Sequence, residues 1–191
     1  DTTRVSILKT FVDPAHEVED AEAALKGAAD IIAERWSEDP ATRAWLRDQL
    51  GRGCVKTKKK RGYDGEDHRF ETFYDFSEPI ARLAPHRFLA MRRGESERVL
   101  SLAIDVDDAK LTAAISRRLL TNPGFMFRRE LEATVTDCYT RLLKPSISTE
   151  VLSSLREVAE KQAISVFATN LSELLLAPPA SRKTILGIDP G

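Results

Sequence analysis

The stretch "PSISTEVLSSLREVAEKQAISVFATNLSELLL", residues 145–176, decides the predicted fold because its apolar residues keep helical spacing over about thirty positions. Pro145 suits the first turn of a helix, where the N–H that proline lacks would have no partner. The sequence therefore predicts one long helix near residues 146–176, about 45 Å long at 1.5 Å per residue. "APPASRK" (177–183) ends this helix and is read as a linker. The apolar face of the helix consists of Leu155, Ala159, Ala163, Val166, Phe167, Leu171 and Leu174.

Two shorter helices are predicted immediately before the long one. Leu111, Ile115 and Leu119 mark the first, which ends at "TNPG" (121–124) because Asn-Pro-Gly favours a turn. The apolar stripe of the second consists of Phe127, Leu131, Val135, Cys138 and Leu142.

The first fifty residues predict a pair of helices. Asp13-Pro14 has the residues of a helix start, a capping side chain followed by proline in the first turn. Apolar residues then recur at helical spacing as far as Trp36. Asp39-Pro40 repeats the start signal for a shorter helix, which Gly51 and Gly53 end.

The middle of the chain has a different pattern. "CVKTK" (54–58) and "RVLSLAIDVD" (98–107) contain alternating apolar and polar residues with β-branched side chains, which is typical of strands. We expect these two strands to pair into a small sheet. The aromatic-rich segment between them, residues 70–95, is broken by Pro79 and Pro85 and is read as short helices.

The predicted fold is therefore mainly α, a helical scaffold with a small β-sheet and one long helix. Its elements divide the chain into four predicted parts. These are a helical pair (1–53), the small sheet with short intervening helices (54–107), a helical region with the long helix and linker (108–183), and the truncated first strand of a further domain (184–191).

Composition is that of a soluble globular protein, with 42% hydrophobic and 31% charged residues. No apolar run approaches the roughly 18 residues that span a bilayer, and no signal peptide is evident, so we expect a cytoplasmic protein without a membrane partner. The two cysteines, Cys54 and Cys138, form no CxxC pair and are expected to stay reduced. Because the chain starts at Asp1 rather than methionine, we expect it to be a piece of a longer protein.

Nucleic-acid binding would require a local basic patch, because 29 Lys and Arg residues balance 30 Asp and Glu residues. The densest cluster is "KTKKKR" (56–61), and such density neutralises phosphates and releases counterions. The alternative is an ordinary solvated loop, whose charge is partly cancelled by "DGED" (64–67). The candidate nucleic-acid-binding residues in this cluster are Lys56, Lys58, Lys59, Lys60 and Arg61.

A second basic pair, Arg92 and Arg93, lies in "RRGESER" (92–98). Gly94 predicts a helix C-terminal cap or a tight turn, where the two arginines would meet the last carbonyls and Glu95 would pair with one of them. This structural role is favoured, and phosphate binding by Arg92 and Arg93 is the functional alternative.

Residues 1–183 show no catalytic motif. His16, His68 and His86 are widely separated, so neither a metal site nor a cofactor is predicted. No nucleophile elbow and no phosphate-binding loop are present. Asp189 lies at the end of a predicted strand in "KTILGIDPG" (183–191), the position where a ribonuclease-H-like nuclease often begins its metal site. Its partner carboxylates would have to come from later strands, so we predict no catalysis by this chain.

Three stretches together resemble the Tex family of bacterial transcription accessory proteins. They are "SEPIARLAPHRFLAMRRGESE" (77–97), "EKQAISVFATNLSELLLAPP" (160–179) and "ILGIDPG" (185–191), and the resemblance extends over essentially the whole chain. It implies the central helical part of an elongated protein. A ribonuclease-H-like domain of the YqgF type would begin at the last strand, and an OB-fold RNA-binding domain would lie beyond it.

This resemblance also implies the function and points to one unusual residue. The chain is expected to be a non-catalytic scaffold in an RNA-binding transcription accessory protein, with most of the RNA affinity supplied by parts outside this sequence. Two alternatives stay open: part of a metal-dependent nuclease whose site begins at Asp189, or a protein–protein interaction module that contacts the transcription machinery through the long helix. Arg98 stands where the family usually has glycine, and Ser148 and Thr149 replace charged residues.

Overall fold

The structure, a computed structural model, describes residues 2–16, 18–63, 65, 68–177 and 187. Asp189, the linker beyond Ala177 and the final strand apart from Gly187 lie outside these residues. The predicted fold class, mainly α with a small sheet and a long C-terminal helix, is confirmed. The division of the chain into four parts stays a prediction.

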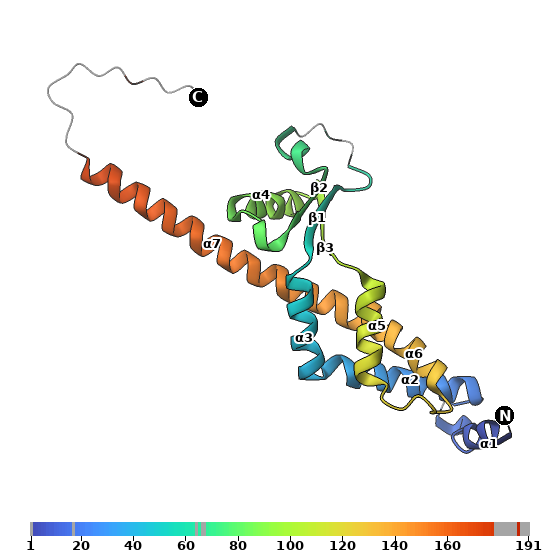
Figure 1. The fold of residues 1–191 in the computed structure, drawn as a ribbon. Helices are drawn as coiled ribbons and strands as arrows, with labels where there is room; N and C mark the ends of the chain where they lie inside the picture. The colour runs from blue at the N-terminus through green and yellow to red at the C-terminus, as the bar shows by residue number, and fades with distance from the viewer. Residues whose placement is uncertain (1, 17, 64, 66–67, 178–186, 188–191) are drawn as a thin grey trace.

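The long helix α7 is the axis of the molecule (Figure 1). Helices α2, α3 and α5 lie around α6 and the first half of α7, and the sheet and α4 lie farther along α7. Short 3₁₀ helices occur at Pro14–His16, His68–Phe73 and Ile80–Arg82. The α-helices are α1 (Thr2–Lys9), α2 (Ala21–Glu38), α3 (Pro40–Gly51), α4 (Pro85–Ser96), α5 (Asp108–Leu119), α6 (Arg128–Asp137) and α7 (Lys144–Leu176).

Helix α6 runs into α7 through a π-helix at Cys138–Leu143. In this wide turn the Lys144 N–H donates to the carbonyl of Tyr139, five residues earlier. Pro145 follows directly, and proline crowds the carbonyl four residues before it. A wide turn at this point relieves that crowding. Pro145 therefore lies in the first turn of α7, as predicted, but the helical run begins much earlier, at Arg128.

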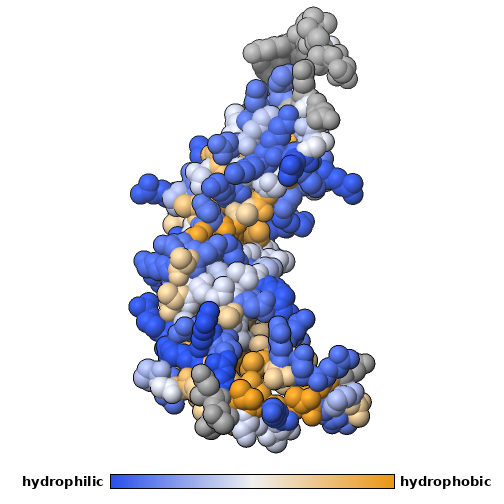
Figure 2. Space-filling view, turned by 90° about the vertical axis from the view of Figure 1, so that its right-hand side faces the viewer, coloured by the Kyte–Doolittle hydropathy of each residue, from blue (hydrophilic) through white to orange (hydrophobic). Residues whose placement is uncertain are grey.

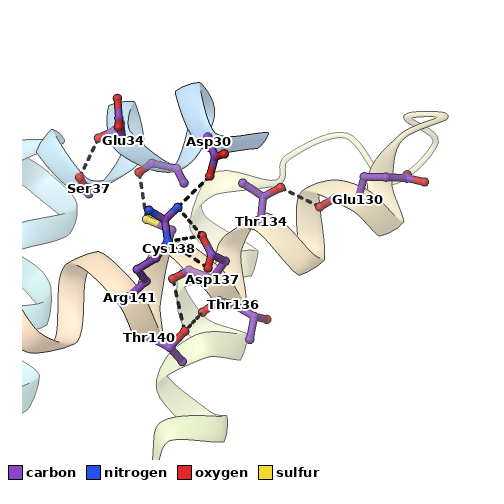
Figure 3. A network of polar contacts seen from close by, with 11 residues as sticks. Asp30, Glu34, Ser37, Glu130, Thr134, Thr136, Asp137, Cys138, Thr140 and Arg141 are labelled. Atoms are coloured by element: carbon purple, nitrogen blue, oxygen red, sulfur yellow. Dashed lines mark hydrogen bonds and ion pairs between the residues drawn. The ribbon is translucent and has the colours of Figure 1, made fainter. Parts of the chain in front are cut away.

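Polar contacts hold the π-helix against α2 (Figure 3). The Arg141 guanidinium bridges Asp30 of α2, at 3.0 Å, and Asp137, at 2.7 Å. Close by, the Cys138 thiol donates to the carbonyl of Ala33 at 3.2 Å. Burial raises the pKa of this thiol to about 11, so Cys138 is a buried, protonated residue of the core.

The two N-terminal helix starts differ in how well the sequence predicts them. Asp39 caps α3 by accepting the N–H of Thr42 at 2.7 Å, with Pro40 in the first turn, as predicted. The start at Asp13-Pro14 is wrong for α2, because these residues begin only the 3₁₀ turn Pro14–His16. Asp20 caps α2 instead, accepting the N–H of Ala23 at 2.8 Å, and it lies next to the first residue of the helix.

β1 (Cys54–Lys59) is the central strand of a three-stranded antiparallel sheet, between β2 (Asp75–Pro79) and β3 (Leu100–Asp105). The predicted pairing of the first and last of these is confirmed. Short helices do form within residues 70–95, as predicted, but Asp75–Pro79 forms the strand β2 rather than a helix. β2 is a short edge strand that ends in proline, and its pairing with β1 cannot be read from its own sequence.

One face of the sheet is buried. Val55 and Thr57 of β1 are fully buried, with Ile104 and Leu102 directly opposite them on β3. The Thr57 hydroxyl donates to the carbonyl of Phe73 at 2.7 Å, so this buried polar group is satisfied. The other face carries the more polar residues of each strand and is more exposed.

The main hydrophobic core lies between α2, α3, α5, the π-helix and the first half of α7. A smaller cluster, made of Phe70, Val99 and Leu100, lies at the far end of β1 with Tyr63, Phe73 and Tyr74 packed against it. Fully buried members of the main core include Ala33, Leu46, Leu50, Ile115, Val135, Tyr139, Leu143 and Ile147.

The apolar face of α7 meets the core only along its first half. Leu155 is partly buried against the core and Ala159 is 2% exposed. Beyond them, Val166 is 60%, Phe167 67% and Leu174 73% exposed. The helical spacing was predicted correctly, but no other element in the described part of the chain covers this second half (Figure 1).

The C-terminus of α4 is a Schellman motif with an arginine in the place of glycine. Arg98 has φ of 62°, in the left-handed region. Its N–H donates to the carbonyl of Glu95 at 3.0 Å, and the Val99 N–H donates to that of Gly94 at 2.9 Å. The prediction that Gly94 ends the helix is therefore wrong, since α4 continues to Ser96.

We expect Arg98→Gly to raise the free energy of unfolding by about 0.5–1 kcal/mol, because glycine adopts positive φ without the steric cost that a side chain brings. Urea unfolding followed by circular dichroism measures the change. Arg98→Ala is the control, since it removes the same charge and keeps the strained backbone. Equal stability of the glycine and alanine variants would contradict the expectation.

Candidate nucleic-acid interface

Four of the seven cations predicted to bind nucleic acid lie at the far end of β1. We call Lys58, Lys59, Lys60 and Arg61 the basic end of the sheet; the side chains of all four are exposed. The strand carries the first two, and the Lys60 N–H donates to the carbonyl of Val99 at 2.8 Å, which extends the pairing by one residue. The chain then turns at Gly62, whose φ of 84° is one that glycine adopts readily.

Lys59 is held in place by aromatic rings. Its Nζ lies 5.6 Å from the centre of the Tyr63 ring and 5.2 Å from that of Tyr74. Both distances are in the range of cation–π attraction. Tyr63 and Tyr74 pack in turn against the small cluster around Phe70. The basic end is therefore anchored to a packed part of the fold rather than carried on a separate loop.

The other three members of the basic end have no such partner. Within the described residues, Lys58, Lys60 and Arg61 form no ion pair. Asp75 lies opposite Lys58 in the register of β1 and β2, and no bond joins their side chains. Most of the acidic "DGED" segment lies outside the described residues. Three exposed cations thus remain available to an anionic partner.

Lys56 belongs to the same predicted cluster but is in a different environment. Its Nζ lies 3.4 Å from an Asp105 carboxylate oxygen on β3. The two residues lie near each other across the strand pair, on the exposed face. A charge with a local counterion gains less from a phosphate, so Lys56 contributes less to an interface than the basic end does.

Arg92 and Arg93 are both ion-paired near the end of α4. Arg92 pairs with Glu95, as predicted, and Arg93 Nε lies 2.8 Å from a carboxylate oxygen of Glu97. Glu97 also accepts from Arg69 at 2.9 Å. These contacts fit the structural role that the sequence favoured. Arg92 also lines a groove of about 510 Å³ between β3, α4 and α7, together with Glu95, Ser148 and Thr149. Lys144, Ser153 and Arg156, which also line it, were not singled out from the sequence.

The described residues offer no sign of a metal centre. No group of three or more His, Cys, Asp or Glu side chains among them is arranged to hold a metal ion. His16 and His68 are exposed, and each lies beside one carboxylate, Asp13 and Glu71 respectively. Nor is any helix within the described ranges long and apolar enough to cross a membrane.

Apolar surface gathers at the opposite end of the molecule. Figure 2 shows hydrophobic side chains at the lower end, where α1 lies in Figure 1. They line an open groove of about 460 Å³ whose walls come from α1, α2 and the start of α6. The basic end and this apolar groove are therefore separate surfaces.

Comparison with known proteins gives a consistent result. The model of the family described as Tex central region-like matches residues 4–167. The chain is 38% identical over 182 residues to YdcI of Bacillus subtilis, covering 94% of this chain and 25% of that protein. It is 37% identical over 183 residues to the transcriptional accessory protein Tex of Neisseria gonorrhoeae, covering 91% of this chain and 24% of that protein. It is also 28% identical over 179 residues to S1 RNA-binding domain-containing protein 1 of Pongo abelii, covering 86% of this chain and 18% of that protein. The chain spans about a quarter of the length of the first two relatives.

Proposed function

The chain belongs to the Tex central region-like family, and from this premise we propose that it is the nucleic-acid-contacting scaffold of a transcription accessory protein. The observation that carries the proposal is the basic end of the sheet. Lys58, Lys60 and Arg61 form no ion pair within the described residues, and all three are exposed next to a packed aromatic cluster. Such a group of cations attracts a phosphate backbone without reading its sequence.

RNA is the proposed partner. Named relatives support this choice: one is a transcriptional accessory protein and another carries an S1 RNA-binding domain in its name. In the whole protein, parts outside this chain would supply most of the affinity, and the basic end would add phosphate contacts. The proposal places the protein in the cytoplasm, where free thiols such as those of Cys54 and Cys138 persist.

The scaffold is proposed to be non-catalytic. A nuclease site with paired metal ions needs several carboxylates on one face, and the described residues bring no such group together. The competing hypothesis assigns metal binding to Asp189, which lies outside those residues. Magnesium- or manganese-dependent cleavage of RNA by this chain would overturn the non-catalytic proposal.

A second candidate function is a protein–protein interaction module that contacts the transcription machinery. The observation that favours it is the exposed second half of α7, where Val166, Phe167 and Leu174 are more than half exposed. Apolar side chains in a row on one helix favour burial against a partner. Replacing Phe167 and Leu174 by glutamate should abolish capture of such a partner and leave RNA binding unchanged.

Replacing Lys58, Lys59 and Lys60 together by glutamine should weaken RNA binding and flatten its salt dependence. Each phosphate contact on a single strand contributes about 0.7 to the slope of log K against log[salt], so three contacts predict a loss of about 2. Fluorescence anisotropy of a labelled single-stranded RNA, titrated at several salt concentrations, measures both quantities.

The matched control replaces three exposed cations elsewhere, Arg35, Lys110 and Arg117, by glutamine. It changes the net charge by the same amount, so a long-range effect of charge would appear in both variants. An unchanged slope in the Lys58, Lys59 and Lys60 variant, or an equal loss in the control, would remove the basic end from the proposal.

A further inference from the structure

The groove between β3 and α7 has the chemistry of a second phosphate site. Its volume is about 510 Å³, within the range of about 300–1,000 Å³ typical of ligand pockets. One wall is the edge of the sheet at β3, and the opposite wall is the first half of α7. The polar side chains that carry the inference are Arg92, Lys144, Ser148, Ser153 and Arg156.

The sheet wall of the groove presents backbone donors. β3 is an edge strand that pairs only with β1 in the described sheet. Because the Lys60 N–H donates to the Val99 carbonyl, the backbone groups of Val99 and of every second residue after it, Ser101 and Ala103, face β1. Leu102 falls between them, so its N–H points away from β1, on the side of the groove that Leu102 lines. An N–H at a sheet edge is a donor that phosphate oxygens accept.

The helix wall supplies hydroxyl groups. Ser148 and Ser153 lie on the same part of α7, and within the described residues neither hydroxyl makes a hydrogen bond to protein. Thr149, between them in the groove, already donates to the carbonyl of Pro145 at 3.0 Å. Two serine hydroxyls are therefore left to bind a ligand in the groove.

The cations of the groove all have carboxylate partners, and those of the two arginines lie on the same helix as the arginine. Arg156 pairs with Glu160 one turn along α7 at 2.7 Å, and about half of each side chain is exposed. Arg92 pairs with Glu95 of its own helix, and Lys144 pairs with Asp108 at 2.7 Å. Ion pairs between partly exposed side chains of one helix contribute little to stability. An arginine that holds a bidentate phosphate gains more, so a phosphate can replace these carboxylates.

The groove and the basic end lie along the same strand. Ser101 is paired with Lys58, and its hydroxyl donates to the Lys58 carbonyl at 3.3 Å. The next residues of β3, Leu102 to Ile104, line the groove. At about 3.3 Å per residue, Ser101 and Ile104 are about 10 Å apart along β3. The groove therefore adjoins the basic end at the β3 edge of the sheet.

We propose that the β3–α7 groove binds backbone phosphates of a nucleic-acid single strand that also contacts the basic end. This inference rests on the proposed function and deepens it, because it assigns a second contact for the same nucleic-acid strand. Arg92 and Arg156 hold the phosphate charge, and the hydroxyls of Ser148 and Ser153 with the Leu102 N–H orient its oxygens.

The test uses one variant that should lower the salt dependence of RNA binding and one that should raise it. Arg92→Gln with Arg156→Gln should lower the salt slope for a labelled single-stranded RNA by about 1.4, two contacts at about 0.7 each. Ser153→Lys places a new cation on the same wall and should raise the slope by about 0.7. The two variants have opposite expected signs, so a general loss of structure cannot produce both results. Arg35→Gln with Arg117→Gln is the matched control.

Each outcome decides one point. If the wild-type chain shows no salt-dependent RNA binding, the proposed function and the groove are both overturned. If the Lys58, Lys59 and Lys60 variant loses slope while the Arg92 and Arg156 variant and Ser153→Lys do not change it, the groove alone is overturned. If the Arg92 and Arg156 variant loses binding to a labelled oligoglutamate peptide while its RNA binding is unchanged, the groove binds an acidic peptide and the inference is also overturned.

Discussion

Tyr139→Ala is expected to lower the free energy of unfolding by about 3–5 kcal/mol, the range measured when a large buried ring is removed. Tyr139 is fully buried and is among the largest such side chains in the protein. It projects from the π-helix into the core formed by α2, α3, α5 and α7. Because the surrounding structure relaxes only partly around a lost ring, a cavity cost is added to the lost burial.

The Tyr139 hydroxyl adds a polar part to this effect. It donates to an Asp108 carboxylate oxygen at 2.6 Å, and Lys144 Nζ lies 2.7 Å from the same carboxylate. Burial and the bond to Asp108 both raise the pKa of Tyr139. For Asp108, burial acts to raise the pKa, but the bonds from Lys144 and Tyr139 outweigh it and leave the pKa below its ordinary value. The hydroxyl therefore stays protonated and donating.

Tyr139→Phe separates the two parts of the effect. It keeps the ring and removes only the bond to a charged acceptor, which contributes about 1.5–3 kcal/mol. Because Asp108 keeps Lys144, we expect the lower end of that range. Urea unfolding monitored by circular dichroism compares the two variants. A cost for Tyr139→Ala that does not exceed that of Tyr139→Phe would mean that the ring is not packed as described.

Gly94→Val should destabilise the protein by about 3 kcal/mol, through overpacking rather than a cavity. Gly94 is buried within α4, and a Cβ placed there would lie 2.7 Å from Leu100 Cδ1 and 3.0 Å from Phe70 Cδ1. Leu100 is 1% exposed and belongs to the cluster that supports Tyr63 and Tyr74, so it has little room to move.

Gly27→Val is the matched control for this substitution. Gly27 also lies inside a helix, α2, but a Cβ there would meet nothing within 4 Å. Valine and glycine differ by only a few tenths of a kcal/mol in helix propensity, so the control should be nearly neutral. Comparable losses of stability at Gly94 and Gly27 would show that helix propensity, not packing against Leu100, determines the result.

The fold was largely predictable where a local signal and the tertiary structure agree. Asp39-Pro40 begins α3 because a cap and a first-turn proline act within one turn. The alternation in β1 and β3 was sufficient to predict their pairing. β2 was missed because an edge strand is stabilised by its partner's backbone, which leaves little pattern in its own sequence. The role of Gly94 was misread, since only the position of Leu100 shows why a side chain cannot fit there.

The candidate site, like the fold, was predictable only where the signal is local in the sequence. The sequence located the cations of the basic end, because charge density is a local property. Sequence could not show that Lys56 lies beside Asp105, a residue 49 positions away. The β3–α7 groove was likewise invisible, because Arg92 and Arg156 come together only when α4 and α7 pack.

By itself, the sequence determined the helical periodicity of α7, the strands β1 and β3, the basic cluster at 56–61 and the resemblance to the Tex family. All of these depend on residues near one another in the chain. The tertiary structure alone decided which of the described cations form no ion pair and which half of the α7 apolar face is covered. Burial and ion pairing depend on distances between elements, and those distances are set by the packing of the whole core.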